Sequence, residues 1–198
     1  MSSKALAVSI ATCALAAAVV AGAGPSRADA LSLKKKVEDI NAFSARPTKQ
    51  PRRTTVTENE VNAYLTYDVG DQMPVGVVEP GVSILGGGRV TARAVVDLDA
   101  VRKQKSSRSL LDPLNYVSGR LPIAATGVLT TSNGVARLQF ESAAIGPVPV
   151  PKLVLQEIVG YYSRTESRPA GIGLDDPFEL PARIREIHVE TGHAIVVQ

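Results

Sequence analysis

The stretch TVTENEVNAYL, residues 55–65, decides the fold because it sets a well-defined helix start directly after a basic, proline-bearing segment. Thr57 suits the N-cap position of a helix, and Glu60 follows three residues later. This spacing predicts a capping box, in which each side chain bonds a free backbone amide of the other residue. Three apolar residues then share one helical face: Val61, Tyr64 and Leu65. The pattern predicts a short helix that docks on another element, since such helices are marginal alone.

The N-terminus has the pattern of a targeting signal. Lys4 precedes an apolar run over residues 5–20, and small residues follow, ending at Ala28-Asp29-Ala30. This pattern predicts a secretory signal peptide over residues 1–30, cleaved after Ala30, and hence a periplasmic or secreted protein. The alternative is an uncleaved membrane anchor, for which the run is short and rich in alanine.

The composition argues against a disulfide-stabilised protein, a thiol enzyme and a nucleic-acid-binding protein. The single cysteine, Cys13, lies inside the apolar run, so the processed chain has neither disulfides nor a catalytic thiol. A net charge of +3 is too small to make nucleic-acid binding the default.

Basic residues concentrate in RPTKQPRR, residues 46–53, which reads either as a solvated linker or as a patch for anionic lipid head groups. That patch consists of Arg46, Lys49, Arg52 and Arg53.

Residues 31–45 predict a first amphipathic helix. Four apolar residues recur at helical spacing: Leu33, Val37, Ile40 and Phe43. Residues 34–36, all lysine, are expected on the opposite side. The predicted organisation is a signal peptide, a helix with basic linker over residues 31–53, and a domain over residues 54–198.

From Gly81 the apolar period changes to two, which predicts β-strands. If residues 86–88, all glycine, form a three-residue hairpin loop, one face carries Val82, Ile84, Val90, Ala92, Ala94, Val96 and Leu98. The next stretch, residues 97–119, breaks this pattern, and Asp112-Pro113 predicts one helical turn near residues 113–118.

Asn133-Gly134 is the clearest hairpin signal in the chain, because it lies between two alternating runs. Pairing about this turn places on one face Ile123, Ala125, Leu129, Leu138, Phe140 and Ala144. Gly127 falls opposite Phe140, whose ring is then expected to cover the glycine backbone.

Prolines at residues 147–151 end the sheet run, and Pro151 begins a predicted helix through about Ser163. A final hairpin turns at Thr191-Gly192. Helices grouped early or between hairpins predict an α+β domain, with a curved antiparallel sheet of about five or six strands packed on one or two amphipathic helices.

No catalytic, metal or cofactor motif is present: the chain lacks a G-x-S-x-G elbow and a phosphate-loop lysine. His188 and His193 share a hairpin face with Glu190, and Asp97 and Asp99 share a predicted strand face. A metal site or a hydrolase built on these groups stays a weaker alternative to ordinary solvent-facing residues.

Small residues dominate the inward faces of the predicted hairpins: Ala92, Ala94, Ala125, Gly127, Ala136 and Ala144. Such a surface permits two outcomes. Either a helix packs very close, with residues 151–163 as the candidate, or a curved sheet leaves room for an apolar guest such as an acyl chain.

The order of motifs resembles bacterial envelope families with lipid-binding folds, similar to the tubular lipid-binding (TULIP-like) proteins and the mycobacterial periplasmic mannan-linked lipid binder. The residues that carry this likeness are Thr57, Glu60, Val61, Asn62, Gly119, Leu121, Pro122, Gly146 and Pro151. The resemblance implies an exported protein that binds or carries a lipid or other apolar ligand.

The expected apolar lining of such a site is Leu129, Leu138, Phe140, Val154, Leu155, Ile158, Tyr161 and Tyr162. The rival reading is a non-enzymatic structural or assembly protein of the cell envelope, and a hydrolase comes third.

Overall fold

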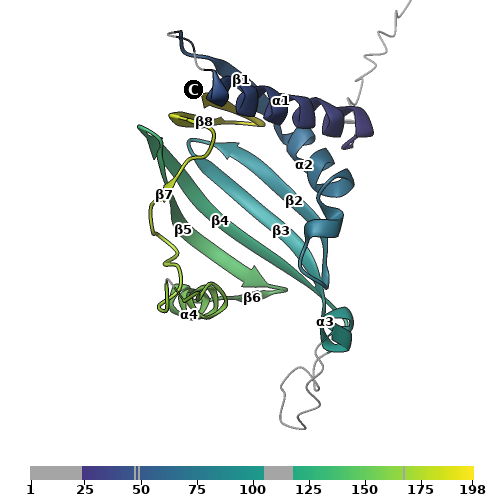
Figure 1. Cartoon of the computed structure of the whole chain (residues 1–198). Helices are drawn as coiled ribbons and strands as arrows, with labels where there is room; N and C mark the ends of the chain where they lie inside the picture. The colour runs from purple at the N-terminus through teal and green to yellow at the C-terminus, as the bar shows by residue number, and fades with distance from the viewer. Residues whose placement is uncertain (1–23, 47, 49, 105–117, 167) are drawn as a thin grey trace, which may run out of the picture.

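The computed structural model describes residues 24–46, 48, 50–104, 118–166 and 168–198. It confirms the predicted α+β class: among these residues an antiparallel six-stranded sheet and a three-stranded sheet combine with four α-helices (Figure 1). The predicted signal segment up to residue 23, and most of the helical turn predicted at residues 113–118, lie outside the described residues.

The larger sheet has the order β2-β3-β4-β5-β6, and a short strand β7 also pairs with β5. Its strands are β2 (Val77–Gly86), β3 (Arg89–Asp97), β4 (Arg120–Ser132), β5 (Val135–Ile145), β6 (Val148–Pro149) and β7 (Phe178–Glu179). Pro149 lies in the edge strand β6, where its missing N–H leaves no gap in a central ladder.

The smaller sheet has the order β1-β9-β8, from β1 (Arg53–Thr57), β8 (Glu186–Glu190) and β9 (His193–Val197). The predicted turn at Thr191-Gly192 is confirmed, because Glu190 pairs with His193. Strand β1 was not predicted: the end of the basic linker and the start of TVTENEVNAYL pair with the C-terminal strand β9 instead.

The helices are α1 (Arg27–Ala45), α2 (Glu58–Tyr67), α3 (Leu98–Gln104) and α4 (Lys152–Tyr162), with a 3-10 turn at Gly70–Gln72. Helix α1 starts earlier than predicted because Ser26 and Asp29 form a second capping box. The buried apolar side chains lie mainly in α1, α2 and the smaller sheet: Ala30, Leu33, Ile40, Val56, Ala63 and Val189. The core is therefore at the helical end of the molecule rather than over the larger sheet.

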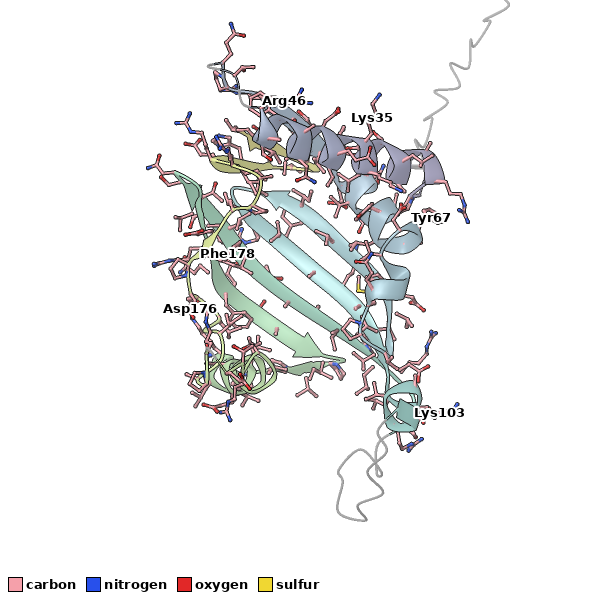
Figure 2. The ribbon with its side chains drawn as sticks, in the orientation of Figure 1. Lys35, Arg46, Tyr67, Lys103, Asp176 and Phe178 are labelled. Carbon is pink, nitrogen blue, oxygen red and sulfur yellow. The ribbon has the colours of Figure 1, made fainter. Side chains whose placement is uncertain are left out.

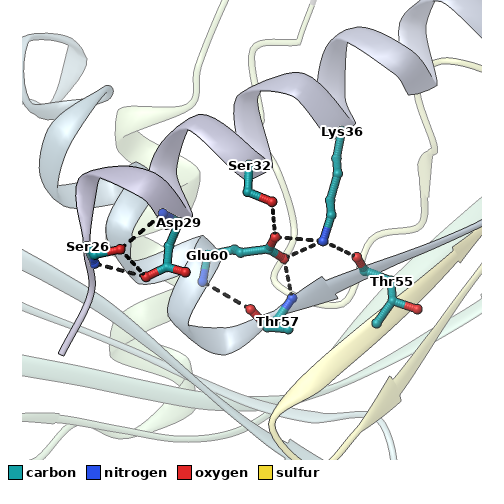
Figure 3. A network of polar contacts seen from close by, with 7 residues as sticks. All are labelled: Ser26, Asp29, Ser32, Lys36, Thr55, Thr57 and Glu60. Atoms are coloured by element: carbon teal, nitrogen blue, oxygen red, sulfur yellow. Dashed lines mark hydrogen bonds and ion pairs between the residues drawn. The ribbon is translucent and has the colours of Figure 1, made fainter. Parts of the chain in front are cut away.

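The capping box predicted at the start of α2 is confirmed. Thr57 Oγ1 accepts a hydrogen bond from Glu60 N at 3.2 Å, and Glu60 Oε2 accepts one from Thr57 N at 2.9 Å. Glu60 is only 6% exposed, and it also accepts hydrogen bonds from Ser32 Oγ at 2.5 Å and Lys36 Nζ at 2.6 Å (Figure 3). Lys36 thus faces α2, which corrects the prediction that residues 34–36 all point away.

Helix α2 also covers the free edge of β2. Glu58 Oε2 accepts a hydrogen bond from Ile84 N at 2.6 Å. The Asn62 amide both donates to Val82 O and accepts from Val82 N, at 2.8 and 2.7 Å. These contacts replace the strand partner that an edge strand lacks, which blocks pairing with another chain at this position.

Two hairpin details differ from the predictions. Gly86 pairs with Arg89, so the loop has two residues, Gly87 and Gly88, and the register is irregular around Leu85. In the Asn133-Gly134 hairpin, Phe140 pairs with Gly127 as predicted, but Ser142 pairs with Thr126.

The extra residue in the second hairpin, Glu141, is a β-bulge that shifts all later positions by one. Ala144 therefore pairs with Ala124 and shares its face, while Ile145 pairs with Ile123 and takes the place predicted for Ala144. Ala143 pairs with Ala125 on the same face as Ile145. Gly127 is needed beside this bulge, since a Cβ there would lie 2.9 Å from Gln139 O. The side chain nearest to Gly127 is Leu138 rather than the expected Phe140 ring.

Asp97 and Asp99 do not share a strand face, which corrects the sequence prediction. Asp97 ends β3 and accepts a hydrogen bond from Ala100 N at 2.9 Å in the first turn of α3. Asp99 lies in α3, where it pairs with Arg102 and accepts a bond from Gly119 N. Both carboxylates hold local structure, and neither faces the other as a catalytic pair does.

The buried carboxylate of Glu60 makes stability depend on pH. Burial by itself raises the pKa of Glu60, but hydrogen bonds from Lys36, Ser32 and Thr57 N outweigh it and hold the pKa below its ordinary value of 4.5. A carboxyl group with a lowered folded-state pKa stabilises the fold above its unfolded pKa. That contribution is lost as the pH falls through the folded-state pKa.

We predict that Lys36→Met lowers the free energy of unfolding near pH 7 by about 2 to 3 kcal/mol, because it leaves a buried carboxylate without its cation. The loss should shrink as the pH falls and Glu60 becomes protonated, because a neutral carboxyl group needs no cation. Urea unfolding at several pH values measures this, with Lys35→Met, an exposed neighbour, as the control that changes stability by less than about 0.5 kcal/mol. Equal effects of the two substitutions at pH 7 would contradict a stabilising role for the Lys36–Glu60 pair.

Candidate functional site

The candidate site is an apolar groove on one face of the larger sheet. Because side chains alternate along strands, the paired residues Ala92 and Ala125 share this face, and so do Ala94 and Ile123. Beyond the bulge, Ala143 and Ile145 join them from β5. The middle of the sheet accordingly carries short side chains (Figure 2).

Helix α4 provides the wall of this groove. Leu155 of α4 and Val150, just before it, line a hollow of about 290 Å³ together with the small residues of β3, β4 and β5. The main sheet contact of α4 is with β5, so it flanks the face rather than filling it. Ala92 and Ala125 remain exposed, which leaves an apolar surface open to a guest.

Polar contacts hold α4 in this position. Asp175 pairs with Lys152 in the first turn of α4, and it also accepts a hydrogen bond from Phe140 N in β5 at 3.2 Å. The bonds from Lys152 and from Phe140 N lower the pKa of Asp175. Further along α4, Gln156 Oε1 accepts a bond from Leu174 N at 2.7 Å. The loop after α4 thus fixes the helix against the edge of β5.

The structure gathers some of the predicted lining residues and separates others. Leu155 lines the groove, whereas Leu129, Leu138 and Phe140 continue its apolar face toward the Asn133-Gly134 turn. Val154 is 47% exposed. The side chains of Ile158, Tyr161 and Tyr162 lie outside the described part of the structure.

The sequence did not predict the β5 side of the groove, for a specific reason. Ala143 and Ile145 face it only because of the Glu141 bulge, and bulges carry no reliable signal in a single sequence. The signal that the sequence did offer for the groove was the set of alanines in β3 and β4. Small side chains at alternating positions leave one face of a sheet with little side-chain bulk.

A larger hollow of about 410 Å³ lies on the opposite face of the same sheet. Glu79 and Arg93 are its charged lining residues, the others are apolar or glycine, and Glu79 pairs with Arg120. The other residues of that face are mostly polar: Thr91, Thr126, Thr130, Arg137 and Gln139. Because charged residues line this hollow and polar residues surround it, the groove beside α4 is the better candidate for an apolar ligand.

The groups considered for metal or hydrolytic chemistry form separate pairs. His188 Nε2 lies 3.1 Å from Glu186, and His193 Nε2 lies 3.1 Å from Glu190. Across the described residues, no three His, Cys, Asp or Glu side chains come close enough together to hold a metal ion.

The basic segment is partly used by the fold. Arg52 lies 3.5 Å from Asp39, stacks over the Phe43 ring at 5.7 Å, and pairs through its backbone with Gln198. Arg46 and Arg53 are exposed, and Lys49 lies outside the described residues.

No family model, curated protein or solved structure matches this chain. Its description therefore depends on geometry alone. Within the described part of the chain, no helix has the length and apolar character to cross a membrane.

Proposed function

We propose that this protein binds a lipid or similar apolar molecule in the groove between α4 and the open face of the larger sheet, as an exported protein of the cell envelope. The observation that carries the proposal is the groove itself: a hollow of about 290 Å³ lined by alanine, isoleucine, valine and leucine residues, with Arg93 as the one charged residue of its lining. Burying an acyl chain there would remove exposed apolar surface of both partners from water, at roughly 25 cal/mol per Å².

An assembly role is the second candidate, because apolar side chains near the groove are also exposed. Val148 of β6 is 61% exposed and Leu153 of α4 is 74% exposed. An apolar segment of a partner protein could cover them. The two roles differ in what the groove retains after purification: a lipid in the first case and nothing in the second.

We predict that Ala125→Trp abolishes binding of a fluorescent acyl-chain probe while the melting temperature stays close to that of the wild type. The indole fills the groove, and Ala125 is exposed, so no dense core is overpacked. Gln139→Trp is the matched control, since it adds the same ring to the polar face of the same sheet.

If both tryptophan variants bind the probe as the wild type does, the groove is not the binding site. If the wild type itself binds no acyl probe, the lipid role fails and the assembly role becomes the better one.

Export remains part of the proposal, and the structure bears on where the signal ends. Cleavage after Ala30 would remove the Ser26–Asp29 capping box of α1 and Ala30, which is 2% exposed. It would also remove Arg27, which stacks over the Tyr67 ring of α2. Ala21-Gly22-Ala23 offers a second A-x-A pattern just upstream, and cutting there keeps α1 whole.

We therefore predict that the mature protein begins at Gly24 rather than Leu31. N-terminal sequencing of protein from the exporting cell measures this directly. A start at Leu31 would show that the first turn of α1 is dispensable, and a start at Met1 in a membrane fraction would show an uncleaved anchor.

A further inference from the structure

Large apolar side chains are exposed mainly around the groove. Among the described residues, thirteen large hydrophobic side chains are exposed, and eight of them lie between Val135 in β5 and Phe178 in β7. Single exposed apolar residues are normal on a protein surface, whereas a cluster of them marks a surface that another molecule covers.

The groove between α4 and the larger sheet is open on one side. Among the described elements, α2 and α4 lie along the two sides of this sheet, and no helix crosses its middle (Figure 1). Ala92 and Ala125, on the floor of the groove, are exposed for this reason. An acyl chain on this floor would keep one side in water, whereas binding sites for small molecules usually bury about 70–90% of the ligand surface. The site is therefore incomplete in a single chain.

The same surface has a hollow and a ridge side by side. The hollow is the alanine-lined groove of about 290 Å³. The ridge is the outer side of α4, where Leu153 is 74% exposed and Val154 is 47% exposed. A two-fold dimer uses the same patch on both subunits, so the patch must be complementary to itself. A ridge next to a hollow meets this condition, because the ridge of each copy can lie across the open side of the other copy's hollow.

The open face is also large enough for a stable dimer. Strands β2–β5 lie about 4.8 Å apart and α4 adds a cylinder about 10 Å across, so the face is roughly 30 Å wide. Its floor runs along β4 from Ile123 to Leu129, a length of about 23 Å at the usual rise of a strand. The resulting area, about 700 Å² per copy, is close to the roughly 800 Å² that each partner buries in a standard interface.

Charge argues against an anionic membrane as the covering surface. Residues 148–179 contain three basic and five acidic side chains, a net charge of −2. Anionic lipid head groups attract basic segments, so this sign is unfavourable. Pairing through strand edges is blocked as well, since Asn62 bonds the backbone of β2 and Asp175 bonds Phe140 N in β5. The face of the sheet is left as the contact surface.

We propose that a second copy of this chain covers the open side of the groove, and that the two copies together enclose the bound lipid. Leu153 of each copy lies over the alanine floor of the other, about a two-fold axis beside α4. The enclosed ligand rests on the lipid role proposed above, whereas the pairing itself depends only on the exposed apolar surface.

Analytical ultracentrifugation of the chain that begins at Gly24 tests the pairing. We expect a dimer, and Leu153→Glu should raise its dissociation constant at least about tenfold, because it adds an acidic group to a net negative surface on both copies. An acidic residue is favourable in the first turn of a helix, so α4 is expected to persist.

Leu31→Glu is the matched control for this substitution. Leu31 is a 64% exposed leucine in α1, which lies at the opposite end of the larger sheet from α4 (Figure 1). This variant should dimerise as the wild type does.

Cross-linking tests the arrangement without relying on Leu153→Glu. The processed chain has no cysteine, so Leu153→Cys and Ala125→Cys each carry a single thiol. A mixture of these two variants with a short bismaleimide should give more cross-linked dimer than a mixture of Leu31→Cys and Ala125→Cys. Equal yields from the two mixtures would contradict the proposed arrangement.

A fluorescent acyl-chain probe separates the pairing from the lipid role. A wild-type dimer that shields the bound probe from iodide, with stronger quenching in Leu153→Glu, supports the enclosed site. A monomer that binds the probe, or a dimer that Leu153→Glu leaves intact, overturns the inference while the lipid role stands. A dimer that needs Leu153 but binds no probe overturns the lipid role and supports the interface between copies.

Discussion

The hydrogen bonds to the buried carboxylate of Glu60 are the interaction on which the rest of the structure depends. This carboxylate lies almost fully out of water, yet three hydrogen-bond donors keep it charged: Ser32 Oγ, Lys36 Nζ and the amide of Thr57. Lys36 Nζ also donates a hydrogen bond to Thr55 O in β1. These contacts tie α1, β1 and the start of α2 together at one point. A buried charge is tolerated only with such complete pairing, so the three elements must assemble in this one arrangement.

The position of α2 determines how the larger sheet is exposed. Glu58 and Asn62 bond the backbone of β2 at Ile84 and Val82, so that edge is closed to other strands. Asp175 does the same at Phe140 on the β5 side. Because these edge positions are protected, strands of another chain cannot pair there even though the alanine-lined face is uncovered. That face is the proposed lipid site.

The sequence predicted features whose cause is local. The Thr57–Glu60 capping box, the Asn133-Gly134 and Thr191-Gly192 turns and helix α4 follow from residue spacing alone, and all four are confirmed. The missed features depend on distant partners. Strand β1 forms through its pairing with β9. Lys36 points toward α2 because it forms an ion pair with the buried carboxylate of Glu60. The Glu141 bulge, which brings Ala143 into the groove, likewise depends on the register with β4.

Native mass spectrometry of protein purified from the exporting cell without detergent tests the central claim most directly. The account predicts a species heavier than the bare chain, whose extra mass appears as a lipid after extraction with organic solvent and disappears on Ala125→Trp. Bare chain alone, with no extractable lipid and an unchanged stability after extraction, would contradict the account and identify the groove as an unfilled surface or a site for a protein partner.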